Sequence, residues 1–377
     1  AKKALHPTIG SRWGGWCSLD VPLDLTPLGA DVEHTVDHCY SRSLYYKGST
    51  VNVTRDDVSL TGDIASGARY VSRDPEANPA MWDWNFAWLL YCDGTSLGGR
   101  LDGPVVAHGP LGERELHFAG SRIRDAAFSL LRDRFGLGGG DGGNVVITGQ
   151  SAGGLASMLH LNWWGESLGD SYDVLGVADG GYFPDYDTSN ATFHEHFVES
   201  YGDQMRYLYD RFDLDVNRDC VEHFSSNGGD AGPEACAFAQ HSFPFLKHPV
   251  FVLNSRYDEW QLKQMLGFTS RGYSDEINAY GATLAESILA SVDGEGGGGD
   301  LRHGAFVDSC VHHLANYELQ IEGVTAMQAL TDWVYAHVSN DWEDVRQVYF
   351  DDSEWPCEEC CHRQRVIKMS DTLASVG

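Results

Sequence analysis

The apolar residues of the chain fall into short continuous runs, separated by longer stretches in which apolar and polar positions are mixed. The clearest runs are residues 86–92, 145–148, 174–178 and 249–253. Each run is short for a helix and is bounded by polar residues or glycine. We therefore predict that each is a buried strand.

Three mixed stretches predict helices. Residues 119–135 have the 3.6-residue apolar period of an amphipathic helix, and residues 152–161 and 315–337 also read as helices. The glycine-rich residues 136–144 follow a helix and precede a strand, which is the wrong order for a loop that cradles phosphate at a helix N-terminus. We interpret them as a flexible connection from helix to strand.

Strands that alternate with helices predict an α/β fold, with a mostly parallel central sheet and helices on both faces. A polar, aromatic segment at about residues 185–245 interrupts the strand series, and we interpret it as a cap-like insertion over a site. The chain has neither an internal repeat nor a clean linker. We therefore expect one catalytic domain, residues 1–377, that includes this insertion.

The main chemical signal is the motif G-x-S-x-G at residues 149–153, between a predicted strand and a predicted helix. This is the setting of the nucleophile elbow of α/β-hydrolases. In a tight turn of this kind the flanking glycines relieve crowding, and the Ser151 hydroxyl stands clear of the sheet. The backbone N–H of Ala152 can then meet a developing oxyanion. The alternative interpretation is a glycine-rich turn before an ordinary helix.

A serine nucleophile needs a base, and the base needs a carboxylate that orients it. In α/β-hydrolases the chain order is serine, acid, histidine. Asp258 follows the predicted strand at residues 249–253 and is the candidate acid. Spacing alone does not choose the base from the five downstream histidines, which are His303, His312, His313, His337 and His362.

Composition excludes several classes of function. Hydrophobic residues make up 42% of the 377 residues and aromatic residues 12%, which is enough for a sizeable core. The formal net charge of −29 repels nucleic acid and anionic membranes, so we expect neither as a partner. No run approaches 18 uninterrupted apolar residues, so we expect no membrane-spanning helix.

Cysteines and glycosylation sequons together favour a secreted or cell-wall protein. The sequons predict glycosylation at Asn52 and Asn190. The odd cysteine number leaves at least one thiol unpaired or paired between chains. Cysteines and a histidine at residues 357–362 could form a metal cluster, but a secreted chain favours disulfides, so we expect no metal. The nine cysteines are Cys17, Cys39, Cys92, Cys220, Cys236, Cys310, Cys357, Cys360 and Cys361.

Eight collinear segments, which span nearly the whole chain, resemble the pectin acetylesterase and Notum family of extracellular carboxylesterases. The resemblance is closer to the plant-type pectin acetylesterases. The segments are residues 14–17 (GGWC), 91–96 (YCDGTS), 149–156 (GQSAGGLA), 178–183 (ADGGYF), 253–262 (LNSRYDEWQL), 306–313 (FVDSCVHH), 327–334 (MQALTDWV) and, in the tail, 356–357 (PC) with 361–362 (CH).

The resemblance implies a catalytic triad. Ser151 matches the family nucleophile, Asp258 matches the triad acid, and His313 matches the base three residues after a cysteine. His312 is the main rival of His313 on sequence alone.

The resemblance also implies an oxyanion hole formed by the backbone N–H groups of Gly14, Gly15 and Ala152. Trp16 and Asp179 lie in matching segments, and we expect them to line or support the substrate pocket. The alternative for these two residues is a purely structural place in the core.

Four departures from the family pattern stand out, one of which is the extra Cys360. Residues 4–12 read poorly as the strand that family members carry before the Gly14 segment, which puts the first part of the sheet in doubt. Trp13 stands where plant-type members have a glycine, and the acidic glycine-rich insert at residues 293–300 is unusual.

The function implied is a serine carboxylesterase that removes O-acetyl groups from a polysaccharide, pectin or another acetylated glycan, or from a small ester. The reaction passes through an acyl-serine and needs no cofactor. One alternative is a Notum-like deacylase that removes a longer fatty acyl group from a protein or lipid. An alternative of another class is a catalytically silent secreted glycan-binding protein. The sequence does not predict an oligomeric state.

Overall fold

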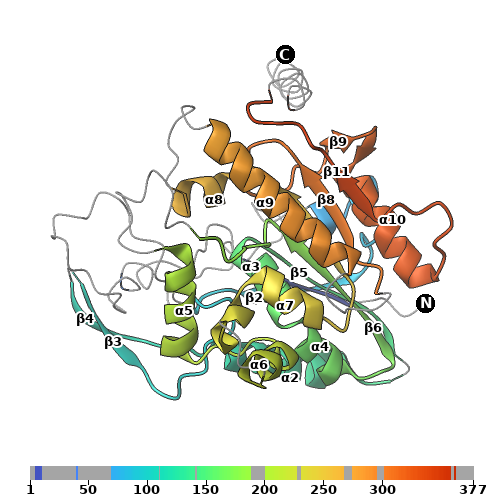
Figure 1. Ribbon diagram of the computed structural model, residues 1–377. Coiled ribbons are helices and arrows are strands. Elements are labelled where there is room, and N and C mark those ends of the chain that lie inside the picture. Colours follow the sequence, from blue (N-terminus) through green and yellow to red (C-terminus); the bar gives the residue numbers. More distant parts are fainter. Residues whose placement is uncertain are drawn as a thin grey trace, which may run out of the picture.

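The central element is a parallel sheet with the strand order β11-β8-β7-β6-β5-β1-β2 (Figure 1). The computed structural model describes residues 5–10, 40, 69–109, 111–140, 142–187, 200–226, 231–266, 274–294, 301–357 and 361. The strands of this sheet are β1 Leu5–Gly10, β2 Asn85–Leu90, β5 Gly143–Gln150, β6 Tyr172–Asp179, β7 Val250–Ser255, β8 Gly304–Asp308 and β11 Val348–Phe350. The four predicted strands are β2, β5, β6 and β7.

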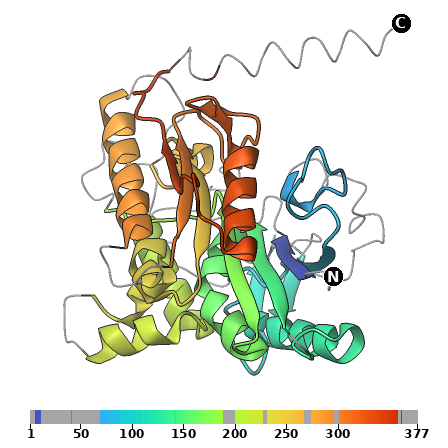
Figure 2. The same cartoon turned by 90° about the vertical axis from the view of Figure 1, so that its right-hand side faces the viewer.

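Helices cover both faces of the sheet, because buried side chains alternate between the faces along each strand. Ile147 and Val252 join one hydrophobic cluster with α2, α3, α4 and α9, whereas Val146 and Phe251 join a second cluster with α10. Figure 2 shows α9 and α10 on opposite sides of the strands. These helices are α2 Gly120–Phe135, α3 Ala152–Leu159, α4 Leu161–Leu168, α9 Ser274–Asp293 and α10 Ala326–Ser339. The predicted α/β-hydrolase-like fold class is confirmed.

Strand β1 corrects the expectation for residues 4–12. It lies between β2 and β5, and Leu5 is in register with both Asn85 and Val145. Its sequence gives a weak strand signal because Pro7 cannot donate a ladder hydrogen bond. Pairing with a neighbour on each side overrides this weak local preference.

The predicted helix at residues 315–337 is wrong before residue 326, where α10 Ala326–Ser339 begins. Residues 320–325 instead form a small antiparallel hairpin of β9 Gln320–Ile321 and β10 Val324–Thr325. Glu322 and Gly323 both have positive φ in its turn, which no helix accommodates. Helix α10 begins after Thr325, whose hydroxyl accepts the backbone N–H of Gln328 at 3.0 Å as an N-cap.

The segment predicted as a cap-like insertion contains short helices between β6 and β7. They are α5 Tyr201–Phe212, α6 Arg218–Ser226, η6 Pro233–Ala237, α7 Ala239–Ser242 and η7 Phe243–Phe245. The disulfide Cys220–Cys236 joins α6 to η6. Helix α7 contacts both α3 and α9, so this segment packs on the face of the sheet that α3 covers. The single-domain organisation stays a prediction.

A hairpin of β3 Val105–Gly109 and β4 Gly112–Leu116 projects from the body (Figure 1). The remaining helices are η4 Arg69–Val71 and α8 Glu259–Gln264. Among the helices described, none has the length and apolar character to span a bilayer. A second disulfide joins Cys310 to Cys361.

Candidate active site

The turn from β5 to α3 holds Ser151 in a strained conformation. Its φ of 57° and ψ of −126° are rare for a residue with a side chain. The backbone N–H of Ser151 donates to the carbonyl of Asp179 at 2.8 Å. Glycine is required nearby, because a Cβ on Gly154 would lie 2.9 Å from Gly181 Cα. The motif at residues 149–153 thus lies where β5 ends and α3 begins, in the predicted order of strand, turn and helix.

Ser151, His313 and Asp258 form one hydrogen-bonded line. Ser151 Oγ lies 2.7 Å from His313 Nε2, and His313 Nδ1 lies 2.8 Å from Asp258 Oδ2 and 3.0 Å from Oδ1. An ionised carboxylate only accepts, so Nδ1 carries the ring proton and Nε2 accepts from the serine hydroxyl. The structure thus brings together the three residues that the sequence pointed to for a triad. This geometry is the one that makes a serine nucleophilic.

Three parallel strands deliver these side chains to one edge of the sheet. Ser151 follows β5, Asp258 follows β7, and the loop that carries His313 follows β8. Asp258 is fully buried and is also the N-cap of α8, because its Oδ1 accepts the backbone N–H of Gln261 at 2.9 Å. The cap fixes the carboxylate independently of the histidine.

The charges around His313 favour its protonated form. Burial disfavours a charged ring and lowers the pKa of His313. The charge and hydrogen bond of Asp258, together with the charge of Asp179, outweigh burial, so the pKa lies above its ordinary value. The ring is therefore well suited to receive a proton.

Asp179 supports the site from within the protein and is fully buried. Its Oδ1 accepts the backbone N–H of Ala315 at 2.7 Å, and its Oδ2 accepts from Gln150 Nε2 at 2.7 Å and from the hydroxyl of Tyr317. Gln150 precedes Ser151, while Ala315 and Tyr317 follow His313. The carboxylate therefore links the serine turn to the histidine loop.

His312 is directed to a different partner. Its Nε2 lies 2.9 Å and 3.0 Å from the two carboxylate oxygens of Asp308. Burial lowers the pKa of His312, but the charge and hydrogen bond of Asp308 outweigh it and raise the pKa to about 9. The structure thus places His313, and not its neighbour, on the serine.

An aromatic cluster beside the imidazole was missed at the sequence level. The ring centroid of His313 lies 6.0 Å from that of Trp260, in a stacked arrangement, and 6.2 Å from that of Phe183. Tyr201, at the start of α5, packs on both aromatic rings at 6.4 Å. Trp260 and Phe183 stand in the segments that carry the family resemblance, which was the available signal. Tyr201 gave none.

Some predicted residues lie outside the described residues. They are Gly14, Gly15, Trp16, Asn52, Asn190 and His362. Ala152, the third predicted oxyanion donor, is the first residue of α3. In the described part of the chain, no group of three or more His, Cys, Asp or Glu side chains could hold a metal ion.

Comparison with known proteins agrees with this geometry. The sequence model of the Pectinacetylesterase family matches residues 25–362. Pectin acetylesterase 5 of Arabidopsis thaliana is 26% identical over 381 residues, covering 93% of this chain and 75% of the relative. Pectin acetylesterase 4 of the same plant is 23% identical, covering 87% and 76%. The human palmitoleoyl-protein carboxylesterase NOTUM is 24% identical, covering 71% and 52%. The chain therefore belongs to the pectinacetylesterase family, as its sequence segments indicated, and is an ester hydrolase.

Proposed function

We propose that the chain is a secreted serine carboxylesterase that hydrolyses O-acetyl esters on a polysaccharide, pectin or another acetylated glycan. The observation that carries the proposal is the line Ser151–His313–Asp258. The names of the Arabidopsis relatives support the acetyl ester and the pectin substrate. Two disulfides between described residues support an extracellular location.

The proposed reaction has two acyl-transfer steps. Ser151 Oγ attacks the ester carbonyl while His313 Nε2 takes the hydroxyl proton, and the same proton then passes to the departing sugar alcohol. Water next attacks the acyl-serine, gives its proton to His313, and releases acetate as Ser151 regains a proton. Asp258 holds the Nδ1–H tautomer and stabilises the imidazolium in both steps.

We assign the developing oxyanion to the backbone N–H groups of Ala152, Gly14 and Gly15. Ala152 supports this role because it opens α3, where N–H groups lack helical partners. Each such donor contributes about 3 kcal/mol to transition-state stabilisation. Trp16 stays a proposed wall of the pocket.

The aromatic cluster favours a short acyl group. Phe183 and Tyr201 are almost fully buried, and their rings pack against Trp260 and each other beside His313. We infer that side chains packed in this way leave little room for a long acyl chain beside His313. We therefore expect acetate esters to be preferred.

Chain-length preference tests the proposal directly. We expect kcat/KM for p-nitrophenyl acetate to exceed that for p-nitrophenyl octanoate by at least about tenfold. A preference for octanoate would instead indicate a Notum-like deacylase. A folded protein that hydrolyses neither ester, and does not react with a fluorophosphonate probe, would indicate a silent glycan-binding protein.

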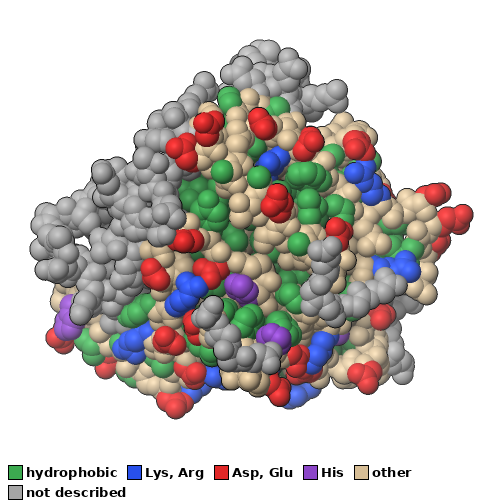
Figure 3. Space-filling model, viewed as in Figure 1, with side chains coloured by type: hydrophobic (Ala, Val, Ile, Leu, Met, Phe, Trp, Pro, Cys, Tyr) green, Lys and Arg blue, Asp and Glu red, His purple; other side chains and the backbone are tan. Residues whose placement is uncertain are grey.

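The acidic surface affects the choice of polysaccharide. Acidic side chains are spread over the face in Figure 3, in keeping with the net charge of −29. Such a surface repels a polyanionic galacturonan, and salt screens this repulsion. Acetate release from acetylated pectin, compared with a neutral acetylated xylan at low and high salt, separates the two substrate classes.

Asp179 offers a test of the proposed support for the site. Asp179→Asn places an amide donor among three donor groups, so we expect kcat to fall about a hundredfold through misplacement of the serine turn and histidine loop. The loss of negative charge also destabilises the His313 imidazolium. The acidic limb of the kcat/KM–pH profile should therefore move to lower pH. An unmoved limb in a folded variant would contradict the electrostatic role.

A further inference from the structure

We propose that the His312–Asp308 ion pair is a positioning element for His313, which shapes the loop carrying the base and places a positive charge beside it. This inference rests on the proposed function, because it assigns His313 as the base. No part of the triad itself requires a second histidine next to the first. The pair therefore needs its own explanation.

The pair closes the base loop on itself. Strand β8 ends at Asp308, and only four residues separate Asp308 from His313. Asp308 accepts from the His312 ring through both carboxylate oxygens, and its Oδ1 also accepts the backbone N–H of Cys310 at 2.9 Å. This arrangement holds the His312 side chain toward β8, away from the serine that His313 reaches.

The backbone of the same loop is tied to the segment that carries the triad acid. The carbonyl of His312 accepts the backbone N–H of Glu259 at 3.2 Å, and the carbonyl of Asp308 accepts that of Arg256 at 2.9 Å. Glu259 directly follows Asp258 in the chain. A shift of His312 would therefore be transmitted to both ends of the Asp258–His313 hydrogen bond.

The charge of His312 depends on its acidic neighbours. Asp308, Asp258 and Asp179 all favour the protonated ring of His312, and the charge of His312 in turn disfavours the protonated ring of the adjacent His313. The Nδ1 atom of His312 is buried without a hydrogen-bond partner in the described part of the chain. Asp308 is thus the group that holds the ring and its charge.

A positive charge beside the base has a chemical use. Asp258 and Asp179 both raise the pKa of His313, whereas the charge of His312 lowers it. A general base must be neutral before attack, so its pKa should not lie far above the working pH. His312 opposes the two carboxylates and keeps more of the neutral base available.

The test compares His312→Gln with His312→Lys, which keeps a positive charge opposite Asp308. For His312→Gln we expect kcat to fall about tenfold or more with little change in KM. The acidic limb of its kcat/KM–pH profile should move to higher pH, opposite in direction to Asp179→Asn. His312→Lys should return the limb toward its wild-type position.

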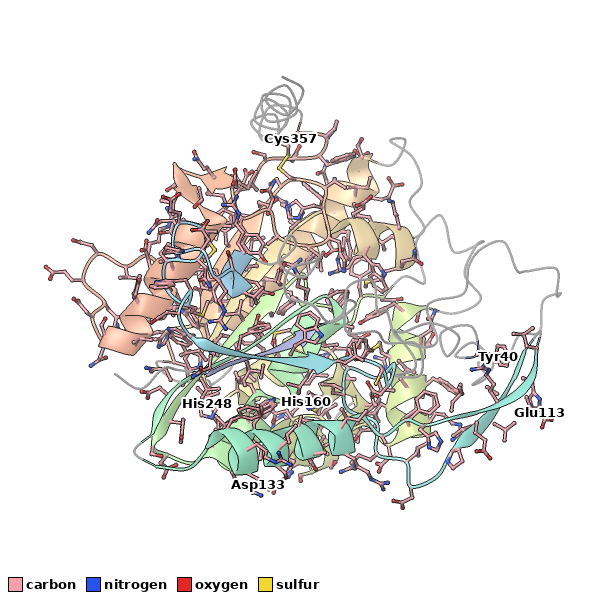
Figure 4. All side chains as sticks on the ribbon, turned by 180° about the vertical axis from the view of Figure 1, so that it is seen from behind. Tyr40, Glu113, Asp133, His160, His248 and Cys357 are labelled. Carbon is pink, nitrogen blue, oxygen red and sulfur yellow. A yellow bond between two sulfur atoms is a disulfide. The ribbon has the colours of Figure 1, made fainter. Side chains whose placement is uncertain are left out.

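A matched control is His108→Gln. His108 lies on the exposed β3–β4 hairpin, with its Nδ1 3.5 Å from Glu113 Oε1. Figure 4 shows Glu113 on this hairpin, away from the central sheet. This variant removes a histidine–carboxylate pair without touching the base loop, so its pH profile should match that of the wild type.

Stability provides a second readout. The folded-state pKa of His312, about 9, lies above the unfolded value of about 6.5. The stability contributed by the pair is therefore fully present below pH 6.5 and is lost as the pH rises through about 9. The difference in unfolding free energy between wild type and His312→Gln should shrink across that interval.

Two outcomes would overturn the inference. One is a His312→Gln variant that loses stability while its acidic limb stays in place, which would leave His312 a structural residue only. The other is a limb that moves equally in His312→Gln and His312→Lys. Failure of the proposed function looks different, because the wild type would then lack esterase activity or keep it in Ser151→Ala.

Discussion

Replacement of Ser151 by alanine is expected to lower kcat for p-nitrophenyl acetate by at least about 10⁴-fold, with the fold preserved. The hydroxyl is the group that His313 contacts at 2.7 Å, and alanine has no atom that can form the acyl intermediate. The backbone hydrogen bond from Ser151 to Asp179 does not involve the side chain, so the turn should survive. Steady-state kinetics measures the fall in kcat, and a thermal unfolding curve tests whether the fold is preserved.

Covalent labelling gives this experiment its control. A fluorophosphonate probe should label the wild type and leave Ser151→Ala unlabelled. Ser157→Ala changes a different buried serine, which lies within α3 and whose hydroxyl donates to the carbonyl of Gly154 at 2.7 Å. That variant should keep the label. Labelling and turnover that persist in Ser151→Ala would place the nucleophile elsewhere.

The change Asp258→Asn should lower kcat by about 10⁴-fold while leaving stability nearly unchanged. An amide cannot serve as an acceptor-only partner for Nδ1–H, so the imidazole tautomer and the stabilised imidazolium are lost. Asparagine is as good an N-cap as aspartate, so α8 should keep its first hydrogen bond to Gln261. This variant should therefore lose activity while its unfolding free energy stays close to that of the wild type.

Asp308→Asn is the natural comparison for Asp258→Asn. Both residues are buried carboxylates that hold an imidazole, but Asp308 holds His312. The loss of kcat should be much larger for Asp258→Asn. Equal losses would mean that the line from Asp258 to Ser151 is not the catalytic one.

The sequence predicted the parts of the fold that local pattern determines. The run at residues 145–148 and the motif that follows it predicted β5, the turn and the start of α3, because steric demands there act between chain neighbours. Strand β1 was missed because its stability comes from two neighbouring strands, and the start of α10 was misplaced because a turn at Glu322 and Gly323 interrupts the pattern.

The site was predictable to a different degree. Asp258 could be proposed from its place after a strand, but pattern alone could not choose between His312 and His313. These neighbours share one local sequence, and only the direction of each ring separates them. The aromatic cluster could not be assembled either, because Phe183, Tyr201 and Trp260 come from three separate segments. Their contact is a product of tertiary packing.

The disulfide between Cys310 and Cys361 should make the proposed catalysis sensitive to reductants that act far from the triad. Cys310 stands three residues before His313, and its partner lies 51 residues further along the chain. A reductant that opens this bond would release the base loop from its covalent anchor without touching Ser151 or Asp258. We therefore expect dithiothreitol in an assay buffer to lower the activity, although the proposed chemistry uses no sulfur.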